Sequence, residues 1–302
     1  MLHKIAPKTN LLIHLKDPRS VKSRFQDLWI SIQEEITSRN LRKSNPLRAC
    51  KDQLFPKLQK EQAPHLSLRY DTTNQPWIEN KDSEKLALFI HGLNSSPLSF
   101  SLYLEELKKR SHTTSYFIPY VHQKGYSKLS EAADPILDVA QTYAHLYPKN
   151  PIFLIGHSNG ARIASYIEKR LKANNIHLLS IAGPHGGSIR FKVIKALRLS
   201  SFFHLPEEIT QELSYLSSFA TDSLIEWQTQ ANNIEDRKIS RLFFATADDW
   251  RVFPSKTCFP KLPNSSYYLI SKASHVTILE KTLPFILSYI ESNDQNLSLI
   301  HI

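Results

Sequence analysis

The residues with the clearest chemical potential lie in the segment Gly-His-Ser-Asn-Gly at 156–160. An apolar run at 151–155 precedes this segment and an amphipathic helical pattern follows it, so Ser158 is predicted on a sharp turn between a strand and a helix. Neighbouring backbone passes close to such a turn, and the flanking Gly156 and Gly160 are small enough to allow this. Ser158 is therefore a candidate nucleophile. The alternative interpretation is an idle serine in an ordinary strand-helix loop.

Glycine is scarce in this chain, with 7 residues among 302, where about 7% is usual. Six of the seven lie in three short segments, at 91–96, 156–160 and 182–188. A chain with so few glycines should keep those at positions where a side chain would clash. We therefore expect the functional residues in and around these three segments.

A serine hydroxyl needs a base to remove its proton and a carboxylate to orient that base. In a parallel sheet, both partners come from loops at the carboxyl ends of later strands, at the same edge as the serine turn. A predicted strand at 240–247 leads into Asp249, and the loop after a predicted strand at 266–270 contains His275. We predict that Ser158, His275 and Asp249 act as nucleophile, base and acid.

Two alternatives to this set remain. Asp248 could replace Asp249, which we prefer because the apolar Val252 follows it by three positions. His185 is a rival base expected in a loop next to the serine turn, but it precedes both aspartates in the chain. Either aspartate could also be a solvated carboxylate at the end of a strand.

Acyl chemistry at a serine also needs two backbone N–H groups that stabilise a developing negative charge. The residue after the nucleophile, Asn159, supplies one of them in this type of turn. The second is expected from the loop after the early strand at 86–90, where Gly92 permits a turn that points the Leu93 amide toward the serine. His91 in the same loop is interpreted as a structural histidine.

From residue 85 onward, strand and helix patterns alternate, which predicts an α/β fold with a mostly parallel sheet and helices on both faces. The expected strands lie at 86–90, 115–120, 151–156, 176–182, 240–247 and 266–270. The expected helices lie at 96–110, 135–146, 159–173 and 276–291. Asp134 and Pro135 should begin the second of these helices, as cap and first-turn residue.

Three segments of the chain resemble the α/β-hydrolase superfamily, and within it the bacterial triacylglycerol lipases and related esterases. They are HGLNS at 91–95, GHSNG at 156–160 and AGPHGGS at 182–188, and the last is similar to an A-P-H-x-G-S stretch of those lipases. The resemblance covers residues 85–291 and implies an α/β-hydrolase fold that cleaves carboxylic esters, lipid esters above all, through an acyl-enzyme. The residues that it assigns to catalysis are the triad Ser158, Asp249 and His275 and the oxyanion donors Leu93 and Asn159.

Residues 1–84 are predicted to form an N-terminal extension, with an amphipathic helix near 20–43 and an irregular arm after it. Residues 85–302 are predicted to form the hydrolase domain, with a cap or lid inserted around 188–237. The start of this insertion, SIRFKVIKALRLSSFFHL at 188–205, combines apolar residues with four Lys or Arg residues and no acid. It is either a lid that meets an anionic lipid surface or an ordinary cap packed on the core.

The formal net charge of +10 is spread along the chain, and the sequence shows no zinc finger, basic zipper or RNA-recognition motif, so we expect no nucleic-acid partner. It also shows no apolar run of about 20 residues and no secretory signal, which predicts a cytoplasmic protein or one bound peripherally to a membrane. Cys50 and Cys258 are expected as separate thiols. Neither the calcium-ligand pattern of some related lipases nor another metal motif is visible, and we expect no cofactor.

The same residues allow other functions. A triad of this kind could serve a thioesterase, an acyltransferase or a peptidase, because it defines the class of electrophile rather than the leaving group. A non-catalytic protein that holds a partner or a membrane through a hydrolase scaffold is the remaining alternative. The sequence does not indicate an oligomeric state.

Overall fold

The structure is a computed structural model of the chain. It describes residues 2–4, 84–110, 114–119, 121–200, 203, 205–232 and 237–292. The predicted helix near 20–43, Cys50 and the predicted arm as far as residue 83 lie outside the described residues.

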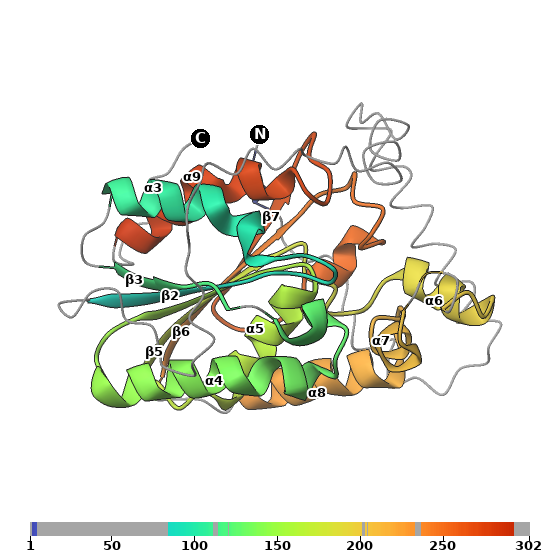
Figure 1. Cartoon of the computed structure of the whole chain (residues 1–302), viewed down its shortest axis with the longest axis horizontal. Coiled ribbons are helices and arrows are strands. Elements are labelled where there is room, and N and C mark those ends of the chain that lie inside the picture. The colour runs from blue at the N-terminus through green and yellow to red at the C-terminus, as the bar shows by residue number, and fades with distance from the viewer. Residues whose placement is uncertain are drawn as a thin grey trace.

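A seven-stranded sheet in the order β1-β7-β6-β5-β4-β2-β3 forms the centre of the described structure (Figure 1). The six predicted strands are confirmed, with ends that differ by up to three residues, and they run parallel to one another. They are β2 (Lys85–Ile90), β3 (Thr114–Phe117), β4 (Ile152–His157), β5 (Asn175–Ile181), β6 (Lys238–Ala245) and β7 (Ser265–Ile270). The sequence pattern did not indicate β1 (Leu2–Lys4), which pairs antiparallel with β7, because three residues are too few to show a periodicity.

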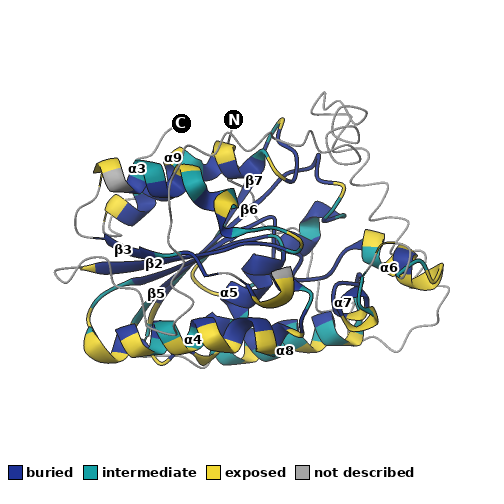
Figure 2. Cartoon of the chain, viewed as in Figure 1, coloured by how far each residue is buried: buried dark blue, intermediate teal, exposed yellow. Residues whose placement is uncertain are grey.

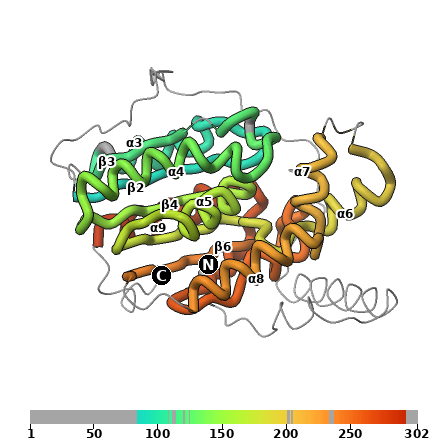
Figure 3. Tube along the Cα trace, turned by 90° about the horizontal axis from the view of Figure 1, so that it is seen from below, coloured from blue at the N-terminus to red at the C-terminus, as the bar shows by residue number. Residues whose placement is uncertain are grey.

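Helices cover both faces of the sheet (Figure 1). On one face lie α3 (Ser101–Arg110), which follows a short 3-10 helix at Pro97–Phe100, and α9 (Ile278–Glu291). On the other face lie α4 (Leu129–Leu146), α5 (Asn159–Arg170) and α8 (Ser218–Asn232), and Figure 3 shows α4 and α5 side by side. This strand order and layering are those of an α/β-hydrolase fold, as predicted.

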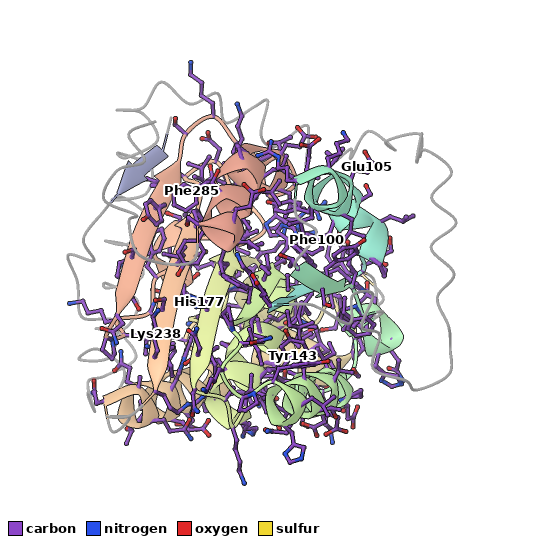
Figure 4. The ribbon with its side chains drawn as sticks, turned by 90° about the vertical axis from the view of Figure 1, so that its left-hand side faces the viewer. Phe100, Glu105, Tyr143, His177, Lys238 and Phe285 are labelled. Atoms are coloured by element: carbon purple, nitrogen blue, oxygen red, sulfur yellow. The ribbon has the colours of Figure 1, made fainter. Side chains whose placement is uncertain are left out.

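Each face of the sheet carries its own apolar core. Phe100 and Phe285 belong to the core under α3 and α9, and Tyr143 belongs to the core under α4 and α5 (Figure 4). All residues of β2 and of β4 are buried (Figure 2), because parallel strands between two helical layers have no face in contact with water. The sheet is therefore a rigid support for the loops at its edges.

The predicted start of α4 is wrong. The helix begins at Leu129 rather than after Asp134, and Pro135 lies inside it. Leu129, Ala132 and Ala133 are buried in the core. Their packing outweighs the one helical hydrogen bond that a proline, which has no N–H, cannot make.

The insertion around 188–237 divides into two parts. Its helices α6 (Ile189–Ala196) and α7 (Glu207–Glu212) stand at one end of the molecule (Figures 1 and 3). Its third helix, α8, instead covers the sheet and places Leu224 and Trp227 in the core. Of the helices described in this insertion, α6 and α7 lie beyond the end of the sheet, where we predicted a cap, and α8 does not.

Candidate active site

Ser158 sits on the turn that the sequence predicts between β4 and α5. Its backbone angles are φ 56° and ψ −125°, a region that residues with a side chain rarely adopt. A methyl group at Gly156 would overlap the carbonyl oxygen of Gly160, and one at Gly160 would overlap the carbonyl oxygen of Ile90. The two glycines thus allow β2, β4 and α5 to meet closely at the strained serine.

The loop after β2 lies directly against Ser158. A Cβ atom added to Gly92 would lie 2.8 Å from Ser158 Cβ and 3.3 Å from its Oγ. Leu93 is the next residue of this loop, and Asn159 is the first residue of α5. Backbone N–H groups in the first turn of a helix have no partner within the helix and favour negative charge. Both predicted amide donors therefore belong to segments that border the hydroxyl.

His275 and Asp249 form a buried pair. Nδ1 of His275 donates a hydrogen bond of 2.6 Å to Oδ2 of Asp249, and both side chains are at most 3% exposed. Oδ1 of Asp249 accepts from the backbone N–H groups of Arg251 and Val252, at 2.8 and 2.9 Å. Burial opposes ionisation of this carboxyl, but the charge of His275 and these three hydrogen bonds outweigh it, so the pKa of Asp249 lies below its ordinary value.

His157 connects the turn at Ser158 to the loop that holds His275. Its Nε2 donates to the backbone carbonyl of His275 at 2.8 Å, and the two ring centroids are 4.8 Å apart. Among the described residues, no hydrogen bond joins the Ser158 hydroxyl to the His275 ring. His157 thus joins the residue before Ser158 to the backbone of the loop that carries His275.

The two alternative residues have other surroundings. The ring of His275 bonds to Asp249 and not to Asp248, whose backbone N–H donates to the hydroxyl of Thr246 at 3.3 Å. His185 is buried between the rings of Trp227 and Phe243 and its Nε2 is 2.8 Å from Ser180 Oγ. Burial, with the nearby positive charges of Arg162 and Lys169, lowers the pKa of His185 to about 3. This imidazole is a neutral core side chain.

His91 has the structural place that the sequence indicates. Its Nε2 accepts from the backbone N–H of Val121 at 3.0 Å, so its Nδ1 is the atom that donates to the carbonyl of Gly92, also at 3.0 Å. The ring is fully buried. His91 therefore ties the loop that contains Leu93 to the segment after β3.

Ser188 is a residue whose role the sequence analysis missed. Its hydroxyl donates to the carbonyl of Arg251 at 2.8 Å and accepts from the N–H of Phe253 at 3.2 Å. Arg251 is one of the two residues whose N–H groups hold Asp249, and Phe253 follows the other, so Ser188 fixes the loop that carries Asp249 from the AGPHGGS segment. The concentration of glycine in that segment was the available signal, because Gly187 there leaves no room for a side chain against the Ser214 carbonyl.

Over the described ranges, no three His, Cys, Asp or Glu side chains are grouped in a way that could hold a metal ion. None of the helices described is both long and apolar enough to span a bilayer. Cys258 is buried in the core under α4 and α5.

Comparisons with known proteins find similarity in backbone arrangement only. No family model matches the chain, and no curated protein matches its sequence. The monoacylglycerol lipase of Paleococcus ferrophilus is 14% identical with a TM-score of 0.48, over 70% of this chain and 96% of that one. The esterase of Exiguobacterium antarcticum is 17% identical with a TM-score of 0.46, over 71% and 95%. With TM-scores below 0.5, these likenesses assign no function to this chain.

Proposed function

We propose that the protein is a serine hydrolase of carboxylic esters, with Ser158 as nucleophile, His275 as general base and Asp249 as the acid that orients it. The proposal is supported by a strained serine after β4 and a buried carboxylate-imidazole pair in the loops after β6 and β7, because parallel strands have their carboxyl ends on the same side of the sheet. A hydroxyl at such a turn, backed by a histidine whose Nδ1 is held by a carboxylate, is the arrangement that acyl transfer to serine requires.

The reaction follows from the direction of proton transfer. Nε2 of His275 takes the proton of Ser158 as its Oγ attacks the acyl carbonyl carbon, and Asp249 stabilises the imidazolium that forms. The same proton passes to the leaving alkoxide as the carbon-oxygen bond breaks, which leaves an acyl-serine and a free alcohol. Water then attacks the acyl-serine with the same assistance and releases the carboxylic acid.

Each tetrahedral intermediate carries a negative oxygen that the backbone N–H groups of Leu93 and Asn159 stabilise. Both groups belong to segments in contact with Ser158, and the first turn of α5 adds a favourable partial charge.

Removal of the hydroxyl tests the nucleophile. Ser158→Ala should lose labelling by a fluorophosphonate probe and reduce hydrolysis of a p-nitrophenyl ester by about a thousandfold or more. Ser180→Ala is the matched control, because Ser180 is a buried serine whose hydroxyl lies 2.8 Å from a histidine nitrogen, that of His185. The control should keep both activities. Labelling that survives in Ser158→Ala would refute the assignment.

Lipid esters are the substrate class that we favour, because large apolar side chains are exposed next to the site. Trp250 follows Asp249 and is 42% exposed, and Val276 follows His275 and is 39% exposed. On the cap, Val193 and Leu197 are 48% and 62% exposed. Only Ile194 of α6 is buried (Figure 2). Apolar groups in these positions suit long acyl chains better than short ones.

The exposed cations of α6 favour contact with an anionic membrane surface. Arg190, Lys192, Lys195 and the adjacent Arg198 alternate with the exposed apolar residues. We expect binding to phosphatidylglycerol vesicles but not to phosphatidylcholine vesicles, and a double change of Lys192 and Lys195 to Gln should weaken it by about tenfold or more. The control changes Lys238 and Lys281, exposed cations elsewhere. Equal binding to both vesicles, or activity that peaks with acetate esters, contradicts the lipid part of the proposal.

A further inference from the structure

A continuous chain of buried polar groups runs from the nucleophile turn to the cap. Nδ2 of the Asn159 side chain donates to the carbonyl of Gly125 at 3.3 Å, and its Oδ1 accepts from Nη1 of Arg162 at 2.9 Å. Nη2 of Arg162 donates to Oε2 of Glu212, the last residue of α7, at 3.3 Å. One guanidinium thus bridges the residue next to Ser158 and the end of a cap helix.

Burial makes this bridge specific. Asn159, Arg162 and Glu212 are 4%, 5% and 9% exposed, and the ring of Phe219 lies 5.4 Å from the centre of the guanidinium. Water cannot replace these partners easily, and the flat guanidinium holds its two acceptors in fixed directions. Because Arg162 donates a hydrogen bond to the side-chain oxygen of Asn159, the side-chain nitrogen of Asn159 is directed toward the carbonyl of Gly125.

Gly125 carries the link onward to the second amide donor. This residue ends the 3-10 helix His122–Gly125 and has a φ of 81°. A Cβ atom added to it would lie 3.5 Å from Leu93 Cα, 3.7 Å from Leu93 N and 3.4 Å from Asn159 Nδ2. The turn at Gly125 therefore packs on Leu93 while the Asn159 side chain holds it in place.

We propose that Arg162 and Glu212 are positioning residues, which set the spacing of the Leu93 and Asn159 amides through the Asn159 side chain. The position of α7 then determines how well the oxyanion is stabilised. The cap therefore contributes to kcat and not only to substrate binding. This inference rests on the proposed function.

A second buried ion pair on the same helix provides a matched control. Glu168, near the other end of α5, accepts from Arg241 at 2.6 Å and from the indole of Trp227 at 3.1 Å. Both members of this pair are 2% exposed, but their partners belong to β6 and α8 rather than to the turn at Ser158. Loss of this pair should affect stability alone.

The experiment compares Asn159→Leu, Arg162→Lys and Glu212→Gln with the control Glu168→Gln. For each variant, kcat and KM are measured with a p-nitrophenyl ester per active site titrated by a fluorophosphonate. The inhibition constant of an alkyl trifluoromethyl ketone is measured as well, because its adduct with the serine carries the same negative oxygen as the intermediate. The melting temperature reports folding.

We expect the three test variants to lower kcat by about 10-fold to 100-fold. This loss is at most comparable to the loss of kcat when one oxyanion donor is removed. The inhibition constant should rise in parallel, while KM changes less than about threefold. Glu168→Gln should lower the melting temperature and leave kcat and the inhibition constant at parent values. Glu212→Gln keeps the shape of the side chain, so it provides a folded test if the other variants misfold.

Two outcomes overturn the inference. One is that Glu212→Gln and Asn159→Leu both keep the kcat and the inhibition constant of the parent protein. The other is an equal loss of kcat in Glu168→Gln, which would trace the effect to stability. Failure of the proposed function looks different, since the parent protein itself would then neither react with the fluorophosphonate nor hydrolyse the ester.

Discussion

His275 and His185 are both almost fully buried and both hydrogen-bonded, but their partners differ in charge. His275 faces the carboxylate of Asp249, whereas His185 faces the hydroxyl of Ser180 with Arg162 and Lys169 nearby. A buried imidazole can accept a proton near neutral pH only where a negative group offsets the cost of burying its charge. Burial and a hydrogen bond to a hydroxyl are therefore not enough for the role that we propose for His275.

The largest expected difference in kcat is between variants of His275 and of His185. His275→Gln should reduce kcat by about four orders of magnitude, because it removes the proton acceptor of Ser158. His185→Gln should keep kcat within about threefold and destabilise the fold by about 1–3 kcal/mol, since it disturbs a buried hydrogen bond with Ser180. Ester kinetics and urea unfolding of both variants measure this. A His185→Gln variant without activity but with parent stability would reverse the assignment.

The next largest difference separates the neighbouring aspartates. Asp249→Asn should lower kcat by about a thousandfold or more, because an amide cannot stabilise the imidazolium of His275. Asp248→Asn should change kcat by less than about threefold, since the His275 ring bonds to Asp249. Steady-state kinetics with one soluble ester decide between them, with melting temperatures as the check on folding. Equal losses of kcat in both variants would show that the two aspartates share the role of the acid.

The smallest expected effect is on stability as a function of pH. Burial lowers the pKa of His185 to about 3, and burial with the nearby charge of His275 does the same for His157. Between about 6.5 and 3 the unfolded chain therefore binds protons that the folded chain does not, so stability should fall as the pH is lowered, by up to about 1.4 kcal/mol per unit for each histidine.

Urea unfolding at pH 7, 6 and 5 measures how steeply the free energy of unfolding changes with pH. In His185→Gln the slope should be shallower than in the parent, because one of the two buried neutral histidines is gone. The charged groups around the second, Asp249 and Arg251 beside His275, stay in place in this variant. Identical slopes in parent and variant would show that His185 is not buried in a neutral form.

The elements that could be predicted from the sequence are those with a local signal. Apolar runs gave the six parallel strands, because a strand buried on both faces needs several apolar residues in succession. The turn at Ser158 could be located because Gly156 and Gly160 lie two positions before and after it in the chain, where local crowding leaves no room for a side chain. Pro135 misled the prediction of α4, since the packing of residues that precede it decided where the helix begins.

By itself, then, the sequence determined the kind of sheet, the serine at its edge and the order of the candidate acid and base, all of which follow from local composition and spacing. Tertiary structure alone decided that the His275 ring meets Asp249, that His185 points into the core, and that Arg162 joins Asn159 to Glu212. The reason is physical: Asp249 lies 26 residues from His275, Glu212 lies 50 residues from Arg162, and the rings around His185 belong to Trp227 and Phe243. Partners so far apart in the chain are selected by three-dimensional packing, which leaves no periodic trace in the sequence.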